Sequence, residues 1–519
     1  MGIRKIFIVA VIALLSIIPV FGDFPADPND RIYQYLDLWE GKGLILNLPP
    51  LRPYPIQYLL ELFGEVAARG GEEGKIAREY MEILSPQFSI QPSPGHTSRF
   101  TPDSYYGETG AEFPFIGNLT PLVSYTGRAS VWLLDDEQGN LLPYGGMSKR
   151  DYLTDWSDID LFGRNLAVQQ SLALSTAVGT SSVYLNIGLM RGSFGPFTTN
   201  GLVLGPQAPH TGQFNFTWRM KKSVFTVATL ALTATTNNGE GRYPSKYLAL
   251  HSLNLFPLPW LEVGVFESVV YGGRFEPLYI IPFSEFFYFQ GIIGFPDNSL
   301  IGTSVTIRFL RDFKYALMLY ADDLHFNDMA RLDFDTKYKV AFQTGLFWTP
   351  LYKLLKSVKL DYTLVTPYTY AHIQTSGTVN YQNYTHAGES LGPALEPNSD
   401  RIELEALFTP YKWVDVTLSA GLIRHGNASD GYTDGDGSIF DPGYDDEGNP
   451  TFQDSTRFLS QEILEYNMQC GIGTVTRVPV GKGRLTFEAG YVLEYIWNKD
   501  FEPGEEIRNI VTLGVEYAF

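Results

Sequence analysis

The spacing of hydrophobic and polar residues changes once along the chain. Between residues 29 and 86 apolar side chains recur every three or four positions, whereas from about residue 100 to the end they alternate with polar or small ones. The first spacing predicts amphipathic helices, and the second predicts β-strands whose successive side chains point to opposite faces. We therefore expect a short helical segment followed by a large all-β unit.

Three helices are predicted in the first part. Capping, proline and glycine residues mark their boundaries: Asn29-Asp30 and Gly41 for the first, Pro53 or Pro55 and Gly70-Gly71 for the second, and Ser85-Pro86 after the third. Each helix carries one apolar stripe, so the three are expected to pack on one another as a small bundle.

The strand pattern is clearest at the end of the chain. There Val511, Leu513, Val515, Tyr517 and Phe519 alternate with Thr512, Gly514, Glu516 and Ala518. Further strands of this kind are predicted within residues 166–178, 183–189, 214–220, 313–319, 340–348, 402–408, 414–422 and 485–497. Each such strand has one apolar face and one small or polar face.

Two architectures use such strands. A soluble sandwich buries the apolar face against a second sheet, whereas a membrane barrel turns it outward to lipid. Long strands, aromatic residues at strand ends such as Tyr495 and Trp497, and short turns that alternate with long polar loops favour the barrel. The roughly 415 residues after the helices, at about 23 per strand with its connection, predict an all-β transmembrane barrel of about 16 to 20 antiparallel strands, most simply 18.

This architecture predicts an order along the chain. Residues 1–22, with Arg4 and Lys5 before an apolar run, resemble a cleaved signal peptide for export. Residues 23–95 are then expected to form a periplasmic helical segment, and residues 96–519 an outer-membrane barrel with a long extracellular loop at 426–461. The terminal Phe519 resembles the signature read by the barrel-insertion machinery.

Charge and cysteine content exclude several classes of protein. The chain has 57 acidic and 38 basic residues and a net charge of −19, which disfavours nucleic acid as a partner because its binding requires Lys and Arg to neutralise phosphates. Cys470 is the single cysteine, so no internal disulfide can form. No segment after the first 22 residues has the roughly 20 consecutive apolar residues of a membrane-spanning helix.

Several segments resemble the Wzi-type capsule-assembly family of outer-membrane proteins. They are "DRIYQYLDLWEGKGLI" from residue 30, "MRGSFGPFTTNGLVLGPQAPH" from residue 190, "YIIPFSEFFYFQ" from residue 279, and "YTHAGESLGPALEPNSDRIELE" from residue 384. The resemblance implies a periplasmic helical bundle attached to a largely plugged barrel of about eighteen strands. It also implies an outer face that holds surface polysaccharide.

Three more segments match the family: "GVFESVVYGGR" from residue 264, "GFPDNSLIG" from residue 294 and "LYADDLHF" from residue 319. Charged and amide residues within the matching segments are the candidate site residues. They are Arg191, Glu267, Arg274, Asp297, Asn298, Asp322 and Asp323. Two interpretations are open: a network that holds a plug inside the barrel, since buried charges must be paired, or direct contacts to a glycan. In the loop at 426–461, Asp430, Asp434 and Asp436 could bind Ca²⁺, or they could belong to a solvated acidic loop.

Catalytic signatures are weak. The chain lacks HExxH and CxxC motifs, and the neighbours His251 and Ser252 would point to opposite faces of a strand. We therefore expect a non-enzymatic outer-membrane barrel whose partners are membrane lipid and surface polysaccharide. The alternative is a general or cation-preferring diffusion porin, suggested by small or polar positions such as Thr417, Thr512 and Gly514 and by the acidic balance.

Overall fold

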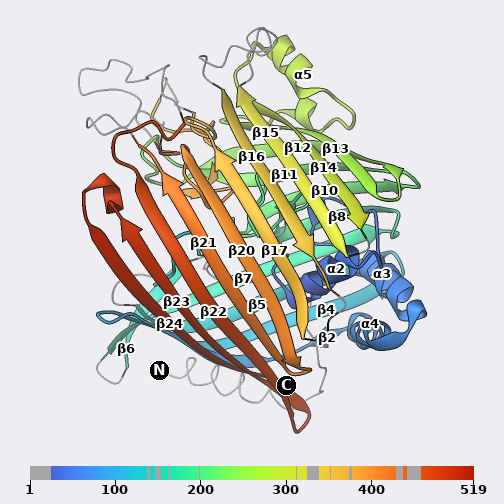
Figure 1. Cartoon of the computed structure of the whole chain (residues 1–519). Helices are drawn as coiled ribbons and strands as arrows, with labels where there is room; N and C mark the ends of the chain where they lie inside the picture. Colours follow the sequence, from blue (N-terminus) through green and yellow to red (C-terminus); the bar gives the residue numbers. More distant parts are fainter. Residues whose placement is uncertain are drawn as a thin grey trace, which may run out of the picture.

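The chain forms a closed antiparallel β-barrel with three helices at one end (Figure 1). The computed structural model describes residues 25–519 except 137–140, 147–153, 162–163, 198, 311, 324–337, 351, 353, 373–376, 428–436 and 441–457. The predicted signal peptide, residues 1–22, lies outside the described residues.

Twenty strands belong to the ring, and two of them, β2 (Ser89–Ile90) and β6 (Thr154–Leu161), are additions that pair with a single neighbour. The other eighteen close the wall, as predicted. The first nine are β3 (Ser93–Phe100), β4 (Tyr105–Thr120), β5 (Val123–Asp136), β7 (Arg164–Gly179), β8 (Val183–Met190), β10 (Thr211–Met220), β11 (Ser223–Ala234), β12 (Tyr243–Leu258) and β13 (Leu261–Gly272). The remaining nine are β14 (Asn298–Leu310), β15 (Phe313–Asp323), β16 (Lys339–Trp348), β17 (Leu355–Val365), β20 (Ser399–Tyr411), β21 (Val414–His425), β22 (Glu465–Val480), β23 (Gly483–Trp497) and β24 (Glu505–Ala518).

The last strand pairs with the first long one and closes the ring. Val511–Glu516 of β24 run antiparallel to residues 95–100 of β3. The wall strands predicted from alternation are confirmed, but β3 begins at Ser93, slightly before the alternation becomes clear in the sequence. Closure pairs the backbone of every wall strand, which a sheet in hydrocarbon requires.

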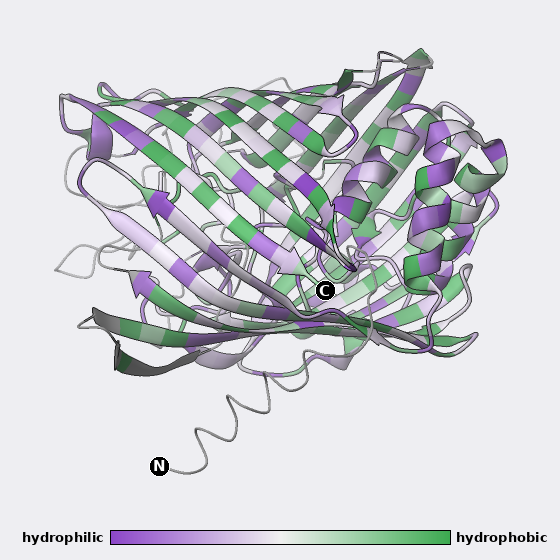
Figure 2. Ribbon diagram, turned by 90° about the horizontal axis from the view of Figure 1, so that it is seen from below, coloured by the Kyte–Doolittle hydropathy of each residue, from purple (hydrophilic) through white to green (hydrophobic). Residues whose placement is uncertain are grey.

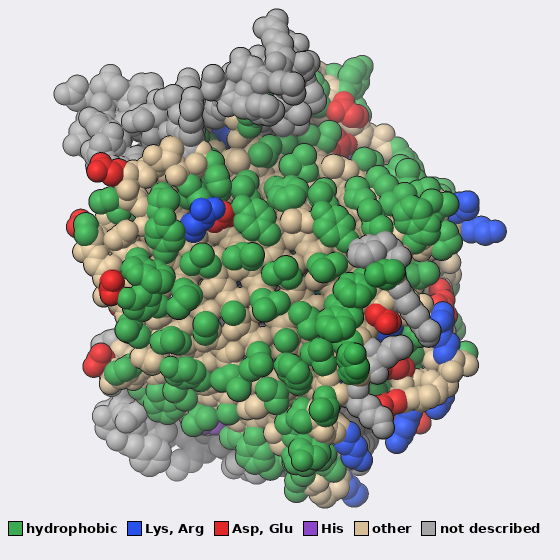
Figure 3. Space-filling view, viewed as in Figure 1, with side chains coloured by type: hydrophobic (Ala, Val, Ile, Leu, Met, Phe, Trp, Pro, Cys, Tyr) green, Lys and Arg blue, Asp and Glu red, His purple; other side chains and the backbone are tan. Residues whose placement is uncertain are grey.

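The outer face of the wall is apolar. On β24 the side chains of Val511, Leu513 and Val515 are between 36% and 49% exposed, while Thr512 and Gly514 lie on the inner face. Figure 2 shows the same alternation of hydrophobic and hydrophilic positions along many strands. In Figure 3 hydrophobic side chains dominate one face of the wall, and most charged side chains lie towards its margins. This surface suits lipid, because the polar faces of the strands point inward.

The two ends of the barrel differ. Short turns, such as those between β10 and β11 and between β22 and β23, lie at the end where β24 also finishes; we call this the short-turn end. The connections at the opposite, long-loop end include residues 191–210, 273–297, 366–398 and 426–464. Two of these connections fold back into the barrel.

The three predicted helices are confirmed as α2 (Arg31–Gly41), α3 (Ile56–Arg69) and α4 (Gly71–Leu84). Their apolar faces share one core that includes Trp39, Phe63 and Tyr80. Among the described residues no helix is long and apolar enough to cross a membrane. The helices gather at the short-turn end, and α2 lies partly within the mouth of the barrel (Figure 1).

The lumen contains a second hydrophobic core. We call the described residues of 191–210 and of 366–398 plug segments 1 and 2. Plug segment 1 contains β9 (Ser193–Phe194), which pairs with β1 (Leu51–Arg52). Plug segment 2 contains β18 (Thr385–His386) and β19 (Glu389–Ser390), which pair with each other. Their apolar side chains pack against inward-facing residues of strands β11 to β17. This side of the barrel is therefore filled by protein.

A third connection packs on the outside of the wall. Residues 273–297, which we call the lateral segment, contain η2 (Pro277–Ile280) and α5 (Phe286–Ile293). Tyr279 and Phe286 bury Ala249 of β12 and Val269 of β13 on the outer face. Another short helix, η3 (Lys499–Phe501), joins β23 to β24.

Candidate functional site

Helix α2 is fixed across the short-turn end of the lumen by ion pairs. At its N-terminal end, Asp30 contacts Arg128 of β5 at 2.6 Å, and Arg31 contacts Asp415 of β21 at 3.1 Å. Arg477 of β22 also binds Asp415, at 2.8 Å. Strands β21 and β22 are neighbours in the ring, whereas β5 lies several strands away from them. The start of the helix is therefore held from two directions.

Glu40 anchors the other end of the helix. It accepts a hydrogen bond from Lys314 of β15 at 2.8 Å and a second one from Arg308 of β14. Burial alone would raise the pKa of the Glu40 carboxyl, but the charges of Lys314 and Arg308 outweigh it and lower this pKa to about 2. Glu40 is therefore ionised at neutral pH and pairs with both cations.

We call these ion pairs, formed by Asp30, Arg31 and Glu40 with the wall, the helix clamp. In the ring order β5 is almost opposite β14 and β15. An eleven-residue helix is roughly 16 Å long, enough to reach a substantial way across the lumen. Breaking a buried pair leaves an unpaired charge, so the helix clamp should hold α2 firmly.

Arg191, a predicted site residue, lies next to the helix clamp. Only 1% of its side chain is exposed, and its Nε atom lies 3.8 Å from Asp27, just before α2. Asp27 accepts a hydrogen bond from the backbone N–H of Asn29 at 2.8 Å. Arg191 also begins plug segment 1, so it joins the helical segment to the plug.

Tyrosine hydroxyls join the two plug segments. Tyr370 and Tyr384 of plug segment 2 donate to the carbonyl oxygens of Leu202 and Val203 in plug segment 1, at 2.8 and 2.7 Å. Tyr320 of β15 donates to the Tyr384 hydroxyl at 3.1 Å. Burial raises the pKa of Tyr370 and Tyr384 well above the usual value, which keeps both hydroxyls protonated as donors.

Two further predicted residues contribute to the plug. Asp322 of β15 accepts from the backbone N–H of Tyr370 at 3.2 Å, and Asn298 of β14 donates to the carbonyl oxygen of Gln382 at 3.1 Å. Both side chains are almost fully buried. Each thus holds plug segment 2 against the wall, as the plug interpretation predicts.

Glu267, Arg274 and Asp297 lie elsewhere. Arg274 and Asp297 form a two-point ion pair at 3.0 and 2.5 Å where the lateral segment leaves and rejoins the wall. Glu267 faces outward on β13 and accepts from the backbone N–H of Phe286 at 3.0 Å. These three residues hold the lateral segment outside the barrel rather than the plug within it.

The remaining predicted residues are not described. Asp323 ends β15, but its side chain lies outside the described part of the structure, as do Asp430, Asp434 and Asp436. Among the described residues no group of three His, Cys, Asp or Glu side chains could hold a metal ion. The calcium site in the loop at 426–461 stays a prediction.

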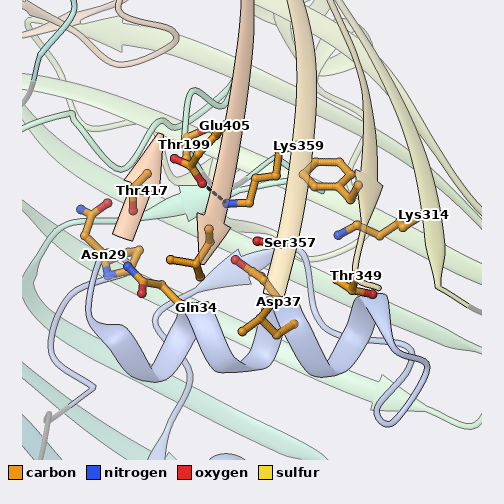
Figure 4. Close-up of a pocket in the computed structure, with 14 residues that line it drawn as sticks. Asn29, Gln34, Asp37, Thr199, Lys314, Thr349, Ser357, Lys359, Glu405 and Thr417 are labelled. Atoms are coloured by element: carbon orange, nitrogen blue, oxygen red, sulfur yellow. Dashed lines mark ion pairs between the residues drawn. The ribbon is translucent and has the colours of Figure 1, made fainter. Parts of the chain in front are cut away.

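A cavity of about 160 Å³ remains between α2 and the wall (Figure 4). Lys359 of β17 and Glu405 of β20 form an ion pair of 3.4 Å on one side, and Asp37 of α2 lies on the other. Thr417, a predicted inward-facing position, lines it as well. The volume is below the roughly 300–1,000 Å³ of typical small-molecule sites, so the cavity is too small for an oligosaccharide.

Sequence reasoning missed the residues that matter most to this architecture: Asp30, Glu40, Tyr370 and Tyr384. The sequence marks Asp30 only as a helix cap. Glu40 did carry a signal, because a glutamate in the last turn of a helix opposes the helix dipole and needs a nearby cation. The tyrosines carried none, since nothing in the sequence shows that a loop turns inward.

Taken together, the geometry defines an outer-membrane type of β-barrel with a helical clamp at one end and folded-in loops within. The sequence matches no protein-family model and no curated protein sequence.

Among solved structures, the fold is similar to that of Wzi, described as an outer-membrane protein involved in group 1 capsule assembly in Escherichia coli and as a carbohydrate-binding β-barrel. The match has 10% sequence identity and a TM-score of 0.58, and covers 95% of this chain and 99% of Wzi. The resemblance predicted from the sequence is thus confirmed at the level of the fold. The porins OccK8 and OprD of Pseudomonas aeruginosa also match, each at 10% identity and a TM-score of 0.45, over 83% and 84% of this chain and 98% and 94% of their own lengths.

Proposed function

We propose that this protein is an outer-membrane barrel that binds or helps to assemble surface polysaccharide. Its short-turn end, with the helical segment, would face the periplasm, and its long loops would face outward. The proposal rests on one observation above all: α2 lies across the lumen and is tied by ion pairs to strands on different sides of the ring. A barrel obstructed in this way suits a binding scaffold better than a diffusion path.

The plug supports the same conclusion. Plug segments 1 and 2 are joined to each other by Tyr370 and Tyr384 and to the wall by Asp322 and Asn298. Their apolar core shows that they are packed rather than loosely inserted. A carbohydrate ligand would accordingly meet the outer face of the loops, and the fold shared with a carbohydrate-binding barrel agrees with that role.

Two measurements test the proposal. Purified protein is applied to an array of bacterial capsular and exopolysaccharides, and a deletion strain is assayed for retention of its surface polysaccharide. We expect selective binding to at least one glycan and release of polysaccharide into the medium on deletion. Normal retention together with an absence of glycan binding would remove the proposal.

A diffusion channel is the second candidate, because one observation favours it. Thr417 of β21 and Thr512 and Gly514 of β24 line the inner face, and no described residue of β24 belongs to the apolar plug core. Planar-bilayer recording distinguishes the two functions. The glycan scaffold should be electrically silent, whereas a channel gives stepwise conductance, with cation preference if acidic residues set its selectivity.

A further inference from the structure

The outer wall carries a hydrogen-bonded serine–histidine pair that belongs to neither the helix clamp nor the plug. His96 and Ser98 lie two positions apart on β3, so both side chains point to the same face of the sheet. His96 Nε2 is 2.7 Å from Ser98 Oγ. His96 Nδ1 is 2.7 Å from Thr109 Oγ1 on β4, directly across the strand pair.

This face is the one that turns outward. In the register with β24, His96 lies opposite Val515 and Ser98 opposite Leu513, whose side chains are 38% and 49% exposed. Thr97, between them, lies opposite the inward-facing Gly514. The pair therefore faces the apolar outer side of the wall, although Ser98 itself is only 5% exposed. Polar side chains in such surroundings are costly and usually serve a function.

The geometry is that of an activated nucleophile. Such a site needs a hydroxyl within hydrogen-bond reach of a base, and a third group that orients the base. When His96 Nδ1 donates to Thr109 Oγ1, the lone pair of Nε2 is left to accept the proton of the Ser98 hydroxyl. Ser98 and His96 thus have the roles of nucleophile and base, and Thr109 is a positioning residue.

A fourth group lies beside the nucleophile. The Tyr105 hydroxyl is 3.4 Å from Ser98 Oγ. Gly107 lies opposite Ser98, and a Cβ atom there would come within 2.3 Å of the Tyr105 hydroxyl oxygen. The glycine therefore leaves the space that Tyr105 occupies, and the hydroxyl is placed to donate to an oxygen held next to Ser98.

We propose that Ser98, His96, Thr109 and Tyr105 form an acyl-ester hydrolase site on the lipid-facing wall, with fatty-acyl esters of membrane lipids as substrates. Ser98 Oγ bonds to the ester carbonyl carbon while His96 takes its proton and Tyr105 donates to the carbonyl oxygen. The bond to the alcohol oxygen then breaks, and His96 protonates that oxygen. Water, activated by His96, repeats the sequence on acyl-Ser98 and releases the fatty acid.

The adjacent residues His251 and Ser252 form no such pair, because the structure places their side chains on opposite faces of β12. The pair at His96 and Ser98 instead has a spacing of two residues, which places both side chains on one face. The proposed activity needs neither the lumen nor the glycan-binding face, so it can fail or succeed independently of the proposed function.

The test uses the full-length protein in detergent micelles. A fluorophosphonate with a long alkyl chain is added, and peptide mass spectrometry locates the modified residue. Release of fatty acid is then measured in mixed micelles in two separate assays, one with a diacyl glycerophospholipid and one with lipid A. Comparing the two assays identifies which lipid supplies the ester. We expect modification at Ser98, and fatty-acid release in at least one assay.

Variants assign the roles. S98A should abolish both labelling and release, and H96A should lower the rate by about 10²–10⁴-fold. T109V should lower the rate and shift its pH profile, and T109S should restore both. T474A is the matched control, because Thr474 is a hydroxyl on the outer face of β22 that donates to the Ala489 carbonyl at 3.2 Å.

Heat-modifiable migration on gels confirms that each variant has folded. Should the folded wild type show neither labelling at Ser98 nor release above the S98A level in either assay, the site is not an esterase. The hydrogen bonds among Ser98, His96, Thr109 and Tyr105 would then have only a structural role.

Discussion

Glu40 of helix α2 and Lys314 of β15 form a 2.8 Å salt bridge across 274 residues of sequence. Both side chains are less than one-tenth exposed, and Arg308 binds the same carboxylate. A glutamate at this end of a helix is unfavourable unless a cation compensates it. This salt bridge therefore fixes the C-terminal end of α2 against the inner face of the barrel.

Replacing Glu40 with alanine should release the end of the helix. The variant leaves Lys314 and Arg308 without their carboxylate, and breaking a buried pair costs about 3–5 kcal/mol. We expect residues 25–90 to become sensitive to protease while the wall keeps its heat-modifiable migration. E79A is the control, because Glu79 lies 4.0 Å from Lys75 in an exposed pair. Equal protease resistance of E40A and E79A would contradict the role of Glu40.

The pairing of Glu40 also predicts a dependence on pH. Its pKa is about 2 in the folded protein against an ordinary value of 4.5. A lowered pKa gives stability that is fully present above pH 4.5 and is lost as the pH falls through about 2. The part of the docking that Glu40 provides, measured as the difference in hydrogen exchange between the wild type and E40Q, should thus be constant from pH 7 to 5 and weaken below. Burial raises the pKa of Asp30 to about 7, and this separate contribution is common to both proteins. In E40Q this acid-dependent component should be absent; an unchanged acid profile in that variant would assign the effect elsewhere.

The tyrosine contacts of the plug can be removed without changing its shape. Y370F and Y384F each delete one hydroxyl and leave the carbonyl of Leu202 or Val203 without its buried donor, at a cost of about 1–3 kcal/mol. Amide exchange in residues 191–210 should accelerate in the double variant. Y352F is a control, since Tyr352 is 68% exposed. Exchange that matches this control would show that the hydroxyls do not hold the plug.

The lateral segment should be immersed in lipid. Phe283, Phe287 and Ile292 are between 60% and 67% exposed on the outside of the wall, and Phe283 stacks on Phe225 of β11 at 4.1 Å. A tryptophan introduced as F287W should be quenched by lipids that carry a spin label on their acyl chains. R274A should reduce this quenching, because it removes the ion pair with Asp297. Quenching by a water-soluble agent instead would place the segment in solvent.

The wall and the helices could be predicted because their signals are local. Val511, Leu513 and Val515 face lipid and Thr512 and Gly514 face the lumen, so alternation alone identifies the strand and its two faces. The helices likewise carry their own caps and apolar stripes. The number of strands followed from chain length, because barrel strands and their connections have a narrow range of sizes.

The fate of the loops could not be predicted in this way. Residues 191–210 and 366–398 fold inward and residues 273–297 fold outward, although all three contain apolar and charged residues. Glu267 shows the difficulty: the sequence indicates the same kind of site for it as for Arg191, yet the two residues lie on different sides of the wall. Which side a loop takes depends on contacts between residues far apart in sequence, and one sequence does not contain that information.

The contact between Arg31 and Asp415 has a consequence for biogenesis. It spans 384 residues, and Arg477, which shares the aspartate, comes later still. Helix α2 therefore cannot reach its final state until the hairpin β21–β22 has joined the growing ring. In a chain arrested before that hairpin, α2 would lack its contact with Asp415. Protection of this helix from protease would therefore indicate that the barrel has been completely assembled.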